Sequence, residues 1–224
     1  MVAAVCANMR NLALIGAPGS GKGTQGKRVA RDTGVPFISM GDILRQKRND
    51  SSALGKKLAE VMAGGGLVSD DIVISIIRER LQESDCGSGF VLDGFPRTVA
   101  QAEALDQLLD EIHKPLSAVL YLDVPEDIIV ERIVGRRVCS KCGHEYHVKF
   151  APPKNAGVCD ACDGELVQRA DDTEGTVRKR QAAFREMTVP VVEFYRRKKV
   201  LRSINGYGPM DDVYAAISAA VRAA

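Results

Sequence analysis

A glycine-rich segment near the N-terminus has the composition of a phosphate-binding loop. Residues 16–24 read GAPGSGKGT, with Gly16 and Gly21 as the outer glycines and Lys22 directly after them. Glycines let backbone N–H groups turn toward phosphate oxygens, and a helix that starts there adds about half a positive charge. Lys22 would supply a mobile cation for the outer phosphates. The alternative is an ordinary glycine-rich turn between a strand and a helix.

Two CxxC pairs predict a metal site. The four cysteines of these pairs are Cys139, Cys142, Cys159 and Cys162. Each pair makes a tight turn that aims two thiolates at one point, and four thiolates complete a tetrahedron around zinc without leaving a position for water. His144 and His147 are nearby alternative ligands, and four free or disulfide-paired thiols are the alternative interpretation. The spacing favours a structural zinc site.

One carboxylate and several arginines complete the candidate chemistry. Asp93 ends the apolar run 90–92, where a carboxylate can hold Mg²⁺ through water; a turn-forming Asp-Gly pair is the alternative. Arg97 follows in GFPR and offers a bidentate fork for a phosphate. Arg132 and Arg136 are four residues apart, so on a helix they would share one face.

Composition restricts the classes of protein to which this chain can belong. Of its 224 residues, 45% are hydrophobic and 27% are charged, and the net charge is +2. These values are ordinary for a globular protein and exclude disordered, collagen-like and coiled-coil classes. No apolar run approaches the ~18 residues of a membrane-spanning helix. The N-terminal residues are too few and too polar for a secretory signal, so we expect a cytoplasmic location, with an organellar one as the alternative.

Apolar strands alternate with helical segments along most of the chain. The pattern predicts strands near 12–15, 37–39, 90–92, 118–122 and 200–204, and helices near 21–32, 41–49, 52–63, 69–82, 98–110, 125–136, 172–197 and 211–222. Such alternation predicts an α/β fold with a parallel sheet covered on both faces, which binds ligands beyond the carboxyl ends of its strands. Between about 137 and 168, glycines, prolines and the four cysteines indicate an inserted small module.

Three longer motifs resemble those of adenylate kinase. They are GAPGSGKGTQ at the start, LDGFPRT at 92–98, and GRRVC followed by QRADDTEGTVRKR. The resemblance runs from about residue 11 to residue 208, and the placement of Thr24 after GKG is similar to that in P-loop kinases of nucleoside monophosphates. It implies Mg²⁺-dependent transfer of the terminal phosphoryl group of ATP to AMP, giving two ADP. The cysteine-bearing insertion resembles the lid of the zinc-containing, long-lid members.

The resemblance also implies how the chain is divided. A P-loop parallel-sheet core flanked by helices would comprise residues 1–38, 69–131 and 172–224. A small helical domain for the monophosphate would comprise 39–68, and a zinc-ribbon-like lid would comprise 132–171. The implied protein is a monomer that takes ATP, AMP and ADP as partners, with neither nucleic acid nor membrane.

The family likeness assigns residues to each part of the reaction. AMP has a phosphate with a second pKa near ~6, so it is a dianionic nucleophile at neutral pH and needs no general base. The residues implied to act on the transferring group are Lys22, Arg97, Arg132, Arg169 and Arg180. The ATP site would further contain Gly19, Ser20, Gly21, Lys22, Gly23, Thr24, Arg136, Tyr146 and Gly208. The AMP site would contain Met40, Arg45, Gly66, Leu67, Val68, Gly94, Phe95, Pro96, Arg97, Gln101, Arg169 and Arg180.

Some positions leave alternatives open. Met40 stands where the family pattern has Thr, so a hydroxyl is missing on the monophosphate side and UMP or CMP is an alternative acceptor, as GTP is an alternative donor. Tyr146 can pack the lid instead of contacting ATP. A nucleic-acid-binding zinc ribbon is disfavoured because segment 138–168 mixes lysines with acidic residues and aromatic residues make up only 5% of the chain. A non-catalytic nucleotide sensor is disfavoured by the full arginine set.

Overall fold

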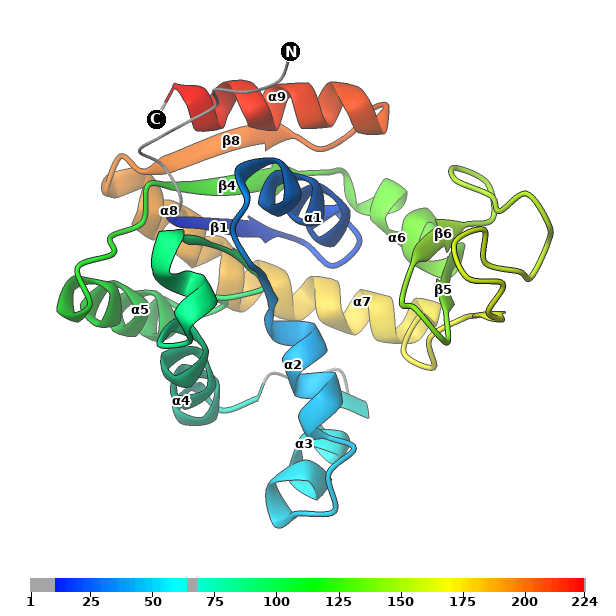
Figure 1. Ribbon diagram of the computed structural model, residues 1–224, viewed down its shortest axis with the longest axis horizontal. Helices are drawn as coiled ribbons and strands as arrows, with labels where there is room; N and C mark the ends of the chain where they lie inside the picture. Colours follow the sequence, from blue (N-terminus) through cyan, green and yellow to red (C-terminus); the bar gives the residue numbers. More distant parts are fainter. Residues whose placement is uncertain (1–10, 64–67, 224) are drawn as a thin grey trace.

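The computed structural model describes residues 11–63 and 68–223, and this part of the chain is organised around a five-stranded parallel sheet (Figure 1). The strands are β1 (Asn11–Gly16), β2 (Phe37–Ser39), β3 (Phe90–Asp93), β4 (Ala118–Asp123) and β8 (Leu201–Asn205), in the order β2-β3-β1-β4-β8. Every neighbouring pair is parallel, which confirms the predicted fold class. Strand β1 is central, so the loop after it opens at the middle of the sheet, where such folds bind ligands.

The strands are continuous apolar runs because both faces of the sheet are buried. Alternate residues of β1 enter different clusters: Leu12 and Leu14 pack on one face, and Ala13 and Ile15 pack on the other. All four side chains are at most 2% exposed. Side chains of a strand point alternately to its two faces, so this run fills both halves of the core.

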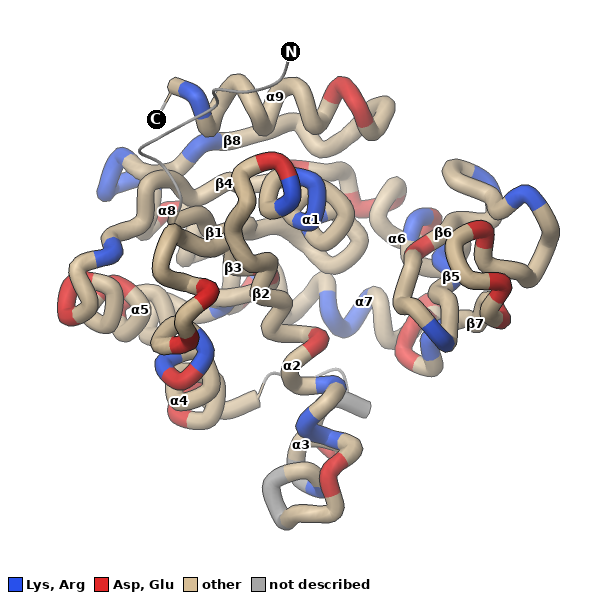
Figure 2. The backbone as a smooth tube through the Cα atoms, viewed as in Figure 1, with Lys and Arg blue, Asp and Glu red and all other residues tan. Residues whose placement is uncertain are grey.

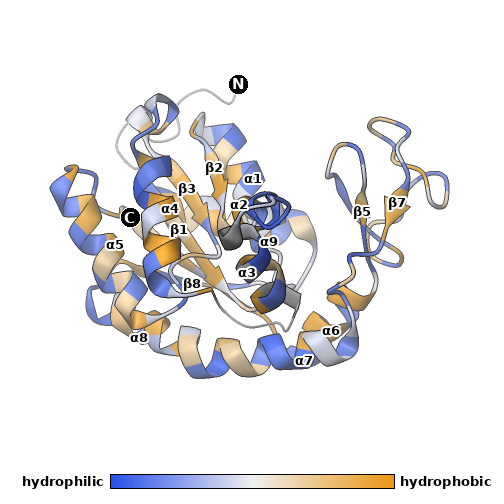
Figure 3. Cartoon of the chain, turned by 90° about the horizontal axis from the view of Figure 1, so that it is seen from below, coloured by the Kyte–Doolittle hydropathy of each residue, from blue (hydrophilic) through white to orange (hydrophobic). Residues whose placement is uncertain are grey.

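Helices cover the two faces in separate layers (Figure 3). On the Leu12 face lie α1 (Lys22–Thr33) and α9 (Met210–Arg222), through residues such as Val29 and Ile217. On the Ala13 face lie α4 (Asp70–Leu81), α5 (Val99–Glu111) and α8 (Val189–Arg197), and the short helix η1 (Ser84–Ser88) precedes β3. No helix in the described ranges is both long and apolar enough to cross a membrane.

Two smaller parts extend from the sheet. Helices α2 (Met40–Lys47) and α3 (Ala53–Ala63) project together below the core in Figure 1. The other part is an antiparallel sheet in the order β6-β5-β7, formed by β5 (Arg136–Cys139), β6 (Glu145–His147) and β7 (Leu166–Val167). This small sheet stands apart from the core, with α6 (Glu126–Val134) and α7 (Glu174–Ala183) at its base (Figure 3). The predicted segments 39–68 and 132–171 include these two parts, and their assignment as monophosphate domain and lid stays a prediction.

The chain leaves the helical conformation earlier than its periodicity predicts. Helix α6 ends at Val134, and Arg136 already begins β5. The prediction that Arg132 and Arg136 share a helix face is therefore wrong. The physical reason lies at Gly135, where a Cβ would come within 2.3 Å of the His147 Nε2. The small sheet packs back onto the end of α6 at this point, a contact that sequence periodicity does not contain.

Candidate active site

A cavity of about 210 Å³ opens at the carboxyl ends of β1 and β3. In the described part of the chain, its cationic side chains are Lys22, Arg45, Arg97, Arg136, Arg169 and Arg180. They come from the first turn of α1, from α2, from the loop after β3, from the lid and from α7. The basic positions of α7 and beside β5 can be followed in Figure 2. The fold thus brings to one cavity cations that are widely spaced along the sequence.

The loop between β1 and α1 has the backbone of an anion cradle. Gly19 and Gly21 have φ angles of +85° and +94°, in the left-handed region that favours glycine. A Cβ on Gly19 would also lie 2.7 Å from the Ile133 side chain. Lys22 Nζ donates to the carbonyl oxygens of Gly16 and Ala17, at 2.6 and 2.8 Å. These two hydrogen bonds therefore hold the Lys22 side chain against the loop.

The charge of Lys22 is weakly compensated in this cradle. Burial lowers the pKa of Lys22 to about 8, although the nearby Asp93 carboxylate acts in the opposite direction. Arg97 and Arg136 add to the positive potential and lower the pKa further. A polyphosphate would supply the negative charge that this position lacks. The predicted role of Lys22 is consistent with this environment.

Asp93 ends β3 and faces the same loop. Its Oδ1 is buried and has no hydrogen-bond partner among the described residues. Burial raises the pKa of Asp93, and the charges of Lys22 and Arg97 oppose this rise. A buried carboxylate oxygen without a partner is uncommon and calls for a donor or a cation. Mg²⁺, which prefers carboxylate and water oxygens, fits this donor set beside a phosphate cradle.

Two arginines of the lid are each paired with a carboxylate. Arg136 binds Asp172 with two hydrogen bonds, of 2.8 and 2.6 Å, and the Asp172 side chain is fully buried. Arg169 pairs with Glu145 at 2.7 Å. These bonds fix the direction of each guanidinium before any substrate is present.

Two further pairs follow the same scheme. Arg180 is paired with Asp171, and Arg45 is paired with Asp42. Although burial acts to raise it, the Arg180 charge holds the pKa of Asp171 below its ordinary value. These carboxylates were not assigned to the site from the sequence. The motif QRADD, in which Asp171 and Asp172 follow Arg169 after a single alanine, is the signal that could have indicated Asp171 and Asp172.

Arg97 differs from the other cavity arginines. It forms no ion pair within the described ranges, and its Nε donates to the Gly94 carbonyl at 2.7 Å. Burial lowers its pKa, and the Asp93 charge opposes this effect. Gly94 has a φ of +74°, and a Cβ there would lie 3.1 Å from the Arg97 Nη2. The glycine therefore leaves room for the folded arginine beside it.

Arg132 lies outside the cavity. Its Nη1 donates to the Gly206 carbonyl at 3.2 Å and to the Ser20 carbonyl at 3.4 Å. It thus joins the phosphate loop to the loop that precedes α9, which also contains Gly208. The structure brings Arg132 to this side of the phosphate loop, and neither Arg132 nor Gly208 lines the cavity. Gly23 and Thr24 lie in the first turn of α1, again outside the cavity lining.

The Tyr146 side chain packs inside the lid, and its assignment to the ATP site stays a prediction. The ring is buried, its hydroxyl accepts a 2.7 Å hydrogen bond from the Asp160 N–H, and the same oxygen lies 3.5 Å from Cys159 Sγ. Tyr146 packs with the cysteines in the small core of the lid, the alternative that its sequence position left open. The physical reason is that the lid has few apolar side chains to fill its interior.

The predicted residues of the AMP site are divided between the cavity and the core. Val68, Gly94 and Pro96 line the cavity, whereas the side chains of Met40 and Phe95 are 1% exposed and belong to the hydrophobic core. The Met40 thioether thus does not reach the site. Gly66 and Leu67 lie outside the described residues. Side chains that line the cavity without having been assigned to it include Ser39, Leu44, Phe184 and Thr188.

Gln101 is committed to internal hydrogen bonds. Its Oε1 accepts from the Arg97 N–H at 2.7 Å, and its Nε2 donates to Asp70 Oδ1 at 2.6 Å. The side chain is 2% exposed and does not line the cavity. In this conformation Gln101 supports the backbone of Arg97, and its contact with adenine stays a prediction.

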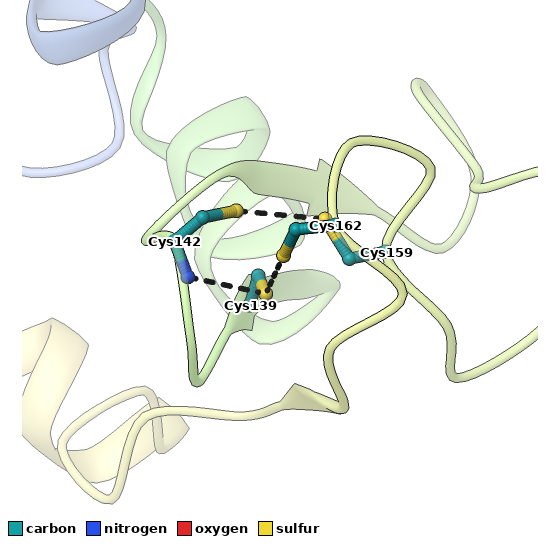
Figure 4. A group of neighbouring side chains, drawn as sticks. All are labelled: Cys139, Cys142, Cys159 and Cys162. Carbon is teal, nitrogen blue, oxygen red and sulfur yellow. Dashed lines mark hydrogen bonds between the residues drawn. The ribbon is translucent and has the colours of Figure 1, made fainter.

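The four lid cysteines converge as their spacing predicts (Figure 4). Their sulfur atoms all lie within 4.8 Å of one another, with Cys139 to Cys162 at 3.5 Å and Cys142 to Cys159 at 3.6 Å. Tetrahedral zinc with Zn–S bonds of about 2.3 Å requires sulfur atoms about 3.8 Å apart, so the arrangement fits this metal. Backbone N–H groups point at the sulfurs of Cys139 and Cys159, as charged thiolates require.

Both halves of this cluster use the same turn. The Gly143 N–H donates to the Cys139 carbonyl at 3.0 Å, and the Asp163 N–H donates to the Cys159 carbonyl at 2.9 Å. Gly143 and Asp163 both have positive φ angles, of 71° and 54°. The repeated geometry aims two sulfur atoms from each turn at a common centre.

Comparison with known proteins agrees with this geometry. The adenylate kinase family model matches residues 14–200. An adenylate kinase of Archaeoglobus fulgidus is 49% identical over 209 residues, which cover 93% of this chain and 96% of the relative. That of Bacillus subtilis is 49% identical over 205 residues, covering 92% and 94%, and that of Thermodesulfovibrio yellowstonii is 48% identical over 208 residues, covering 93% and 97%. The predicted resemblance is confirmed: the chain belongs to the adenylate kinase family.

Proposed function

We propose that the cavity performs the family's reaction by holding two phosphate-bearing substrates among fixed cations, without a general base. As an adenylate kinase, the chain is a phosphotransferase that moves the terminal phosphoryl group of ATP to AMP and yields two ADP. The observation that supports the proposed mechanism is the convergence of Lys22 with five arginines on one cavity. Negative charge spreads over the phosphoryl oxygens during transfer, so prepositioned cations in a site of low dielectric supply most of the stabilisation.

The two ends of the cavity would serve different substrates. On the donor side, the phosphate loop and Lys22 would hold the outer phosphates of ATP, and Arg132 would fix the loop from behind. On the acceptor side, Arg97 and Arg45 would bind the phosphate of AMP. The two substrates would then meet in line between these groups, which is the geometry that phosphoryl transfer needs.

Arg136 and Arg169 of the lid and Arg180 of α7 would act on the phosphoryl group in transit. In the structure, Arg136, Arg169 and Arg180 are neutralised by carboxylates of the protein. Phosphate oxygens would replace part of these partners when both substrates are bound, while the remaining bonds keep each guanidinium directed. Closure of the lid over the cavity would also exclude water, which would otherwise accept the phosphoryl group.

Asp93 is the proposed ligand for Mg²⁺, through bound water. The ion would supply positive charge to the phosphate oxygens of ATP. Asp93 suits this role because its Oδ1 is buried, lies beside the phosphate cradle and lacks a hydrogen-bond partner among the described residues. Its carboxylate would accept hydrogen bonds from the water shell of the ion.

The four lid cysteines are proposed to hold structural zinc. Four thiolates would leave no open coordination position, so the metal would order the lid and take no part in the transfer. We also propose a division of the chain, supported by the two parts that extend from the sheet. It comprises a core of residues 1–38, 69–131 and 172–224, a monophosphate domain of residues 39–68 and a lid of residues 132–171. The monomeric state and the cytoplasmic location stay predictions.

A matrix of substrates tests the proposed specificity. ADP formation is measured with ATP or GTP as donor and AMP, UMP, CMP or GMP as acceptor, at fixed Mg²⁺. We expect ATP with AMP to give the highest kcat/KM by at least about tenfold, because the Met40 side chain is buried and does not alter the cavity wall. A higher kcat/KM for a pyrimidine acceptor would contradict the proposed acceptor, and one for GTP would contradict the proposed donor.

A further inference from the structure

The helix that connects the lid to the sheet contains one irregular turn. Between α7 and α8 lies η2 (Phe184–Thr188), a π-helical turn in which the Val189 N–H donates to the Phe184 carbonyl five residues back. Pro190 explains it, because proline has no N–H for the carbonyl four residues earlier and its ring clashes with that carbonyl. Turns of this kind occur frequently at functional sites.

This turn presents Thr188 to the cavity. The Thr188 side chain is 6% exposed and lines the cavity beside Phe184. Its Oγ1 donates a hydrogen bond of 2.9 Å to the carbonyl of Arg97, which is 91 positions earlier in the chain. The helix that carries Arg180 thereby holds the loop that carries Arg97. One hydroxyl links the lid-side and acceptor-side arginines.

The orientation of Arg97 depends on hydrogen bonds more than that of the other cavity arginines does. Its N–H donates to Gln101 Oε1 at 2.7 Å, and its Nε donates to the Gly94 carbonyl at 2.7 Å. It has no carboxylate partner in the described ranges, whereas Arg136 is directed by two bonds to Asp172. Without an ion pair to aim it, the guanidinium takes its direction from its backbone. A small shift of that backbone would turn the fork away from a phosphate.

We propose that Thr188 is a positioning residue for Arg97. The π turn brings its hydroxyl to the Arg97 carbonyl, and this bond together with Gln101 clamps the Arg97 backbone from both sides. The proposal rests on the proposed role of Arg97 at the acceptor phosphate. Since the hydroxyl is engaged by Arg97, its loss should act on the acceptor and leave the donor site unchanged.

Two substitutions at this position give the test. Thr188→Val removes the hydroxyl at nearly constant shape, and Thr188→Ser keeps it. We expect Thr188→Val to raise the KM for AMP about five- to tenfold, the effect of one lost hydrogen bond to a buried carbonyl, with the KM for ATP within about twofold of the wild type. Thr188→Ser should stay within about twofold for both substrates. An unchanged KM for AMP, or an equal rise in both KM values, would overturn the proposal.

A matched control separates positioning from general loss of stability. The Thr33 hydroxyl also donates to a backbone carbonyl, that of Val29 at 2.7 Å, but it lies at the end of α1. Thr33→Val should lower Tm without changing either KM. Should Thr188→Val not fold, Thr188→Ala removes the same hydroxyl without placing a methyl group against the carbonyl and carries the same expectations.

A double-mutant cycle shows whether Thr188 acts through Arg97. Arg97→Lys should itself raise the KM for AMP, because lysine keeps the charge but lacks the fork. In this background, Thr188→Val should add less than a twofold change. If Thr188→Val raises the KM for AMP as much in this background as in the wild type, the positioning role of Thr188 is wrong, whereas the proposed function is unaffected. If Arg97→Lys leaves the KM for AMP unchanged, the acceptor role of Arg97 in the proposed function is wrong, and the positioning role falls with it.

Discussion

The core and the lid contribute to the same cavity but are ordered by different forces. The core places two large apolar clusters on the two faces of its sheet. The buried cluster of the lid consists of Cys139, Tyr146 and Cys159, with little else against it. Burial of apolar area can order the first region, whereas so small a core cannot order the second. The phosphate loop and Asp93 should therefore persist without metal, while Arg136 and Arg169 should depend on it.

The largest effect is expected from the core half of the cavity. Lys22→Ala removes the cation at the centre of the phosphate loop, so kcat/KM should fall by about a thousandfold or more. The Tm should change little, because burial already disfavours the charge of Lys22. A coupled ADP assay and a melting curve measure both. Turnover at the wild-type rate would show that the phosphate loop has been assigned wrongly.

Removal of metal should unfold the lid and leave the core folded. A strong chelator should release about one zinc ion per chain, expose the segment 139–162 to protease and reduce activity by about ten- to a hundredfold, while the main unfolding transition remains. Cys139→Ser should reproduce this behaviour. Metal analysis, limited proteolysis and calorimetry measure it.

Cys86 provides the control for this experiment. It is fully buried in the core, and burial raises the pKa of its thiol to about 11, so it stays protonated. Cys86→Ser should leave the zinc content unchanged. Loss of zinc in this variant, or a chelator that melts core and lid together, would refute the separate ordering of the two regions.

Substitution of Asp172, at the junction between core and lid, should reduce both stability and activity. Asp172→Asn leaves the partly buried Arg136 without its charge partner, so we expect a loss of about 2–4 kcal/mol in stability and about a tenfold fall in kcat. Glu174→Gln breaks an exposed pair with Arg178 on the same segment and should change stability by less than about 0.5 kcal/mol. Chemical denaturation and kinetics compare the two. If the two substitutions changed stability and kcat equally, burial of the Asp172–Arg136 pair would not contribute to either property.

A pH titration should show a smaller effect on the KM for ATP, which arises from Lys22 in the core half of the cavity. Burial lowers the pKa of Lys22 to about 8, so the free enzyme loses this charge as the pH rises through that value. The KM for ATP should then rise several-fold between pH 7 and pH 9. In Lys22→Arg, whose guanidinium stays charged, the KM for ATP should be flat over this range. A wild-type profile as flat as that of the variant would contradict the lowered pKa.

The same pKa shift has the opposite consequence for folding. The unfolded chain binds a proton at Lys22 up to its ordinary value of 10.5, and the folded chain only up to about 8. Between these two pH values the unfolded state holds more protons, so this residue makes folding more favourable as the pH rises. Burial of the charged lysine costs stability below pH 8.

The smallest effect concerns the symmetry within the lid. Gly143 and Asp163 occupy the same position of the two cysteine turns with positive φ, but only glycine adopts this conformation without strain. Asp163→Gly should therefore raise the stability of the lid by about 0.5 kcal/mol, and Gly143→Asp should lower it. The chelator concentration that releases half of the zinc measures the change. A lower resistance to chelator in Asp163→Gly would contradict this prediction.

The sequence predicts the local features of this molecule better than its long-range contacts. The strand β1, the phosphate loop and the cysteine pairs are encoded within short segments, and the structure has them where they are expected. The end of α6 was predicted too late because Gly135 meets His147, which belongs to the lid. Nothing in the local sequence of Tyr146 shows that its ring fills the interior of the lid.

The partners of the arginines show the same limit. Arg97 can be chosen from its motif, but the bond from Thr188 joins residues 91 positions apart and requires the π turn. The engagement of Gln101 by Asp70 spans 31 positions and depends on the packing of α4 against α5. Such pairs result from tertiary packing, which periodicity and motif spacing do not specify.

The central claim is that the cavity passes a phosphoryl group between two bound nucleotides and keeps water out. It is tested most directly by the rate of ADP formation from ATP and Mg²⁺ with and without AMP, in purified protein that contains zinc. We predict two ADP for each ATP consumed when AMP is present, and a rate at least about a thousandfold lower without it. No ADP from the complete mixture, or consumption of ATP at a similar rate without AMP, would contradict the account.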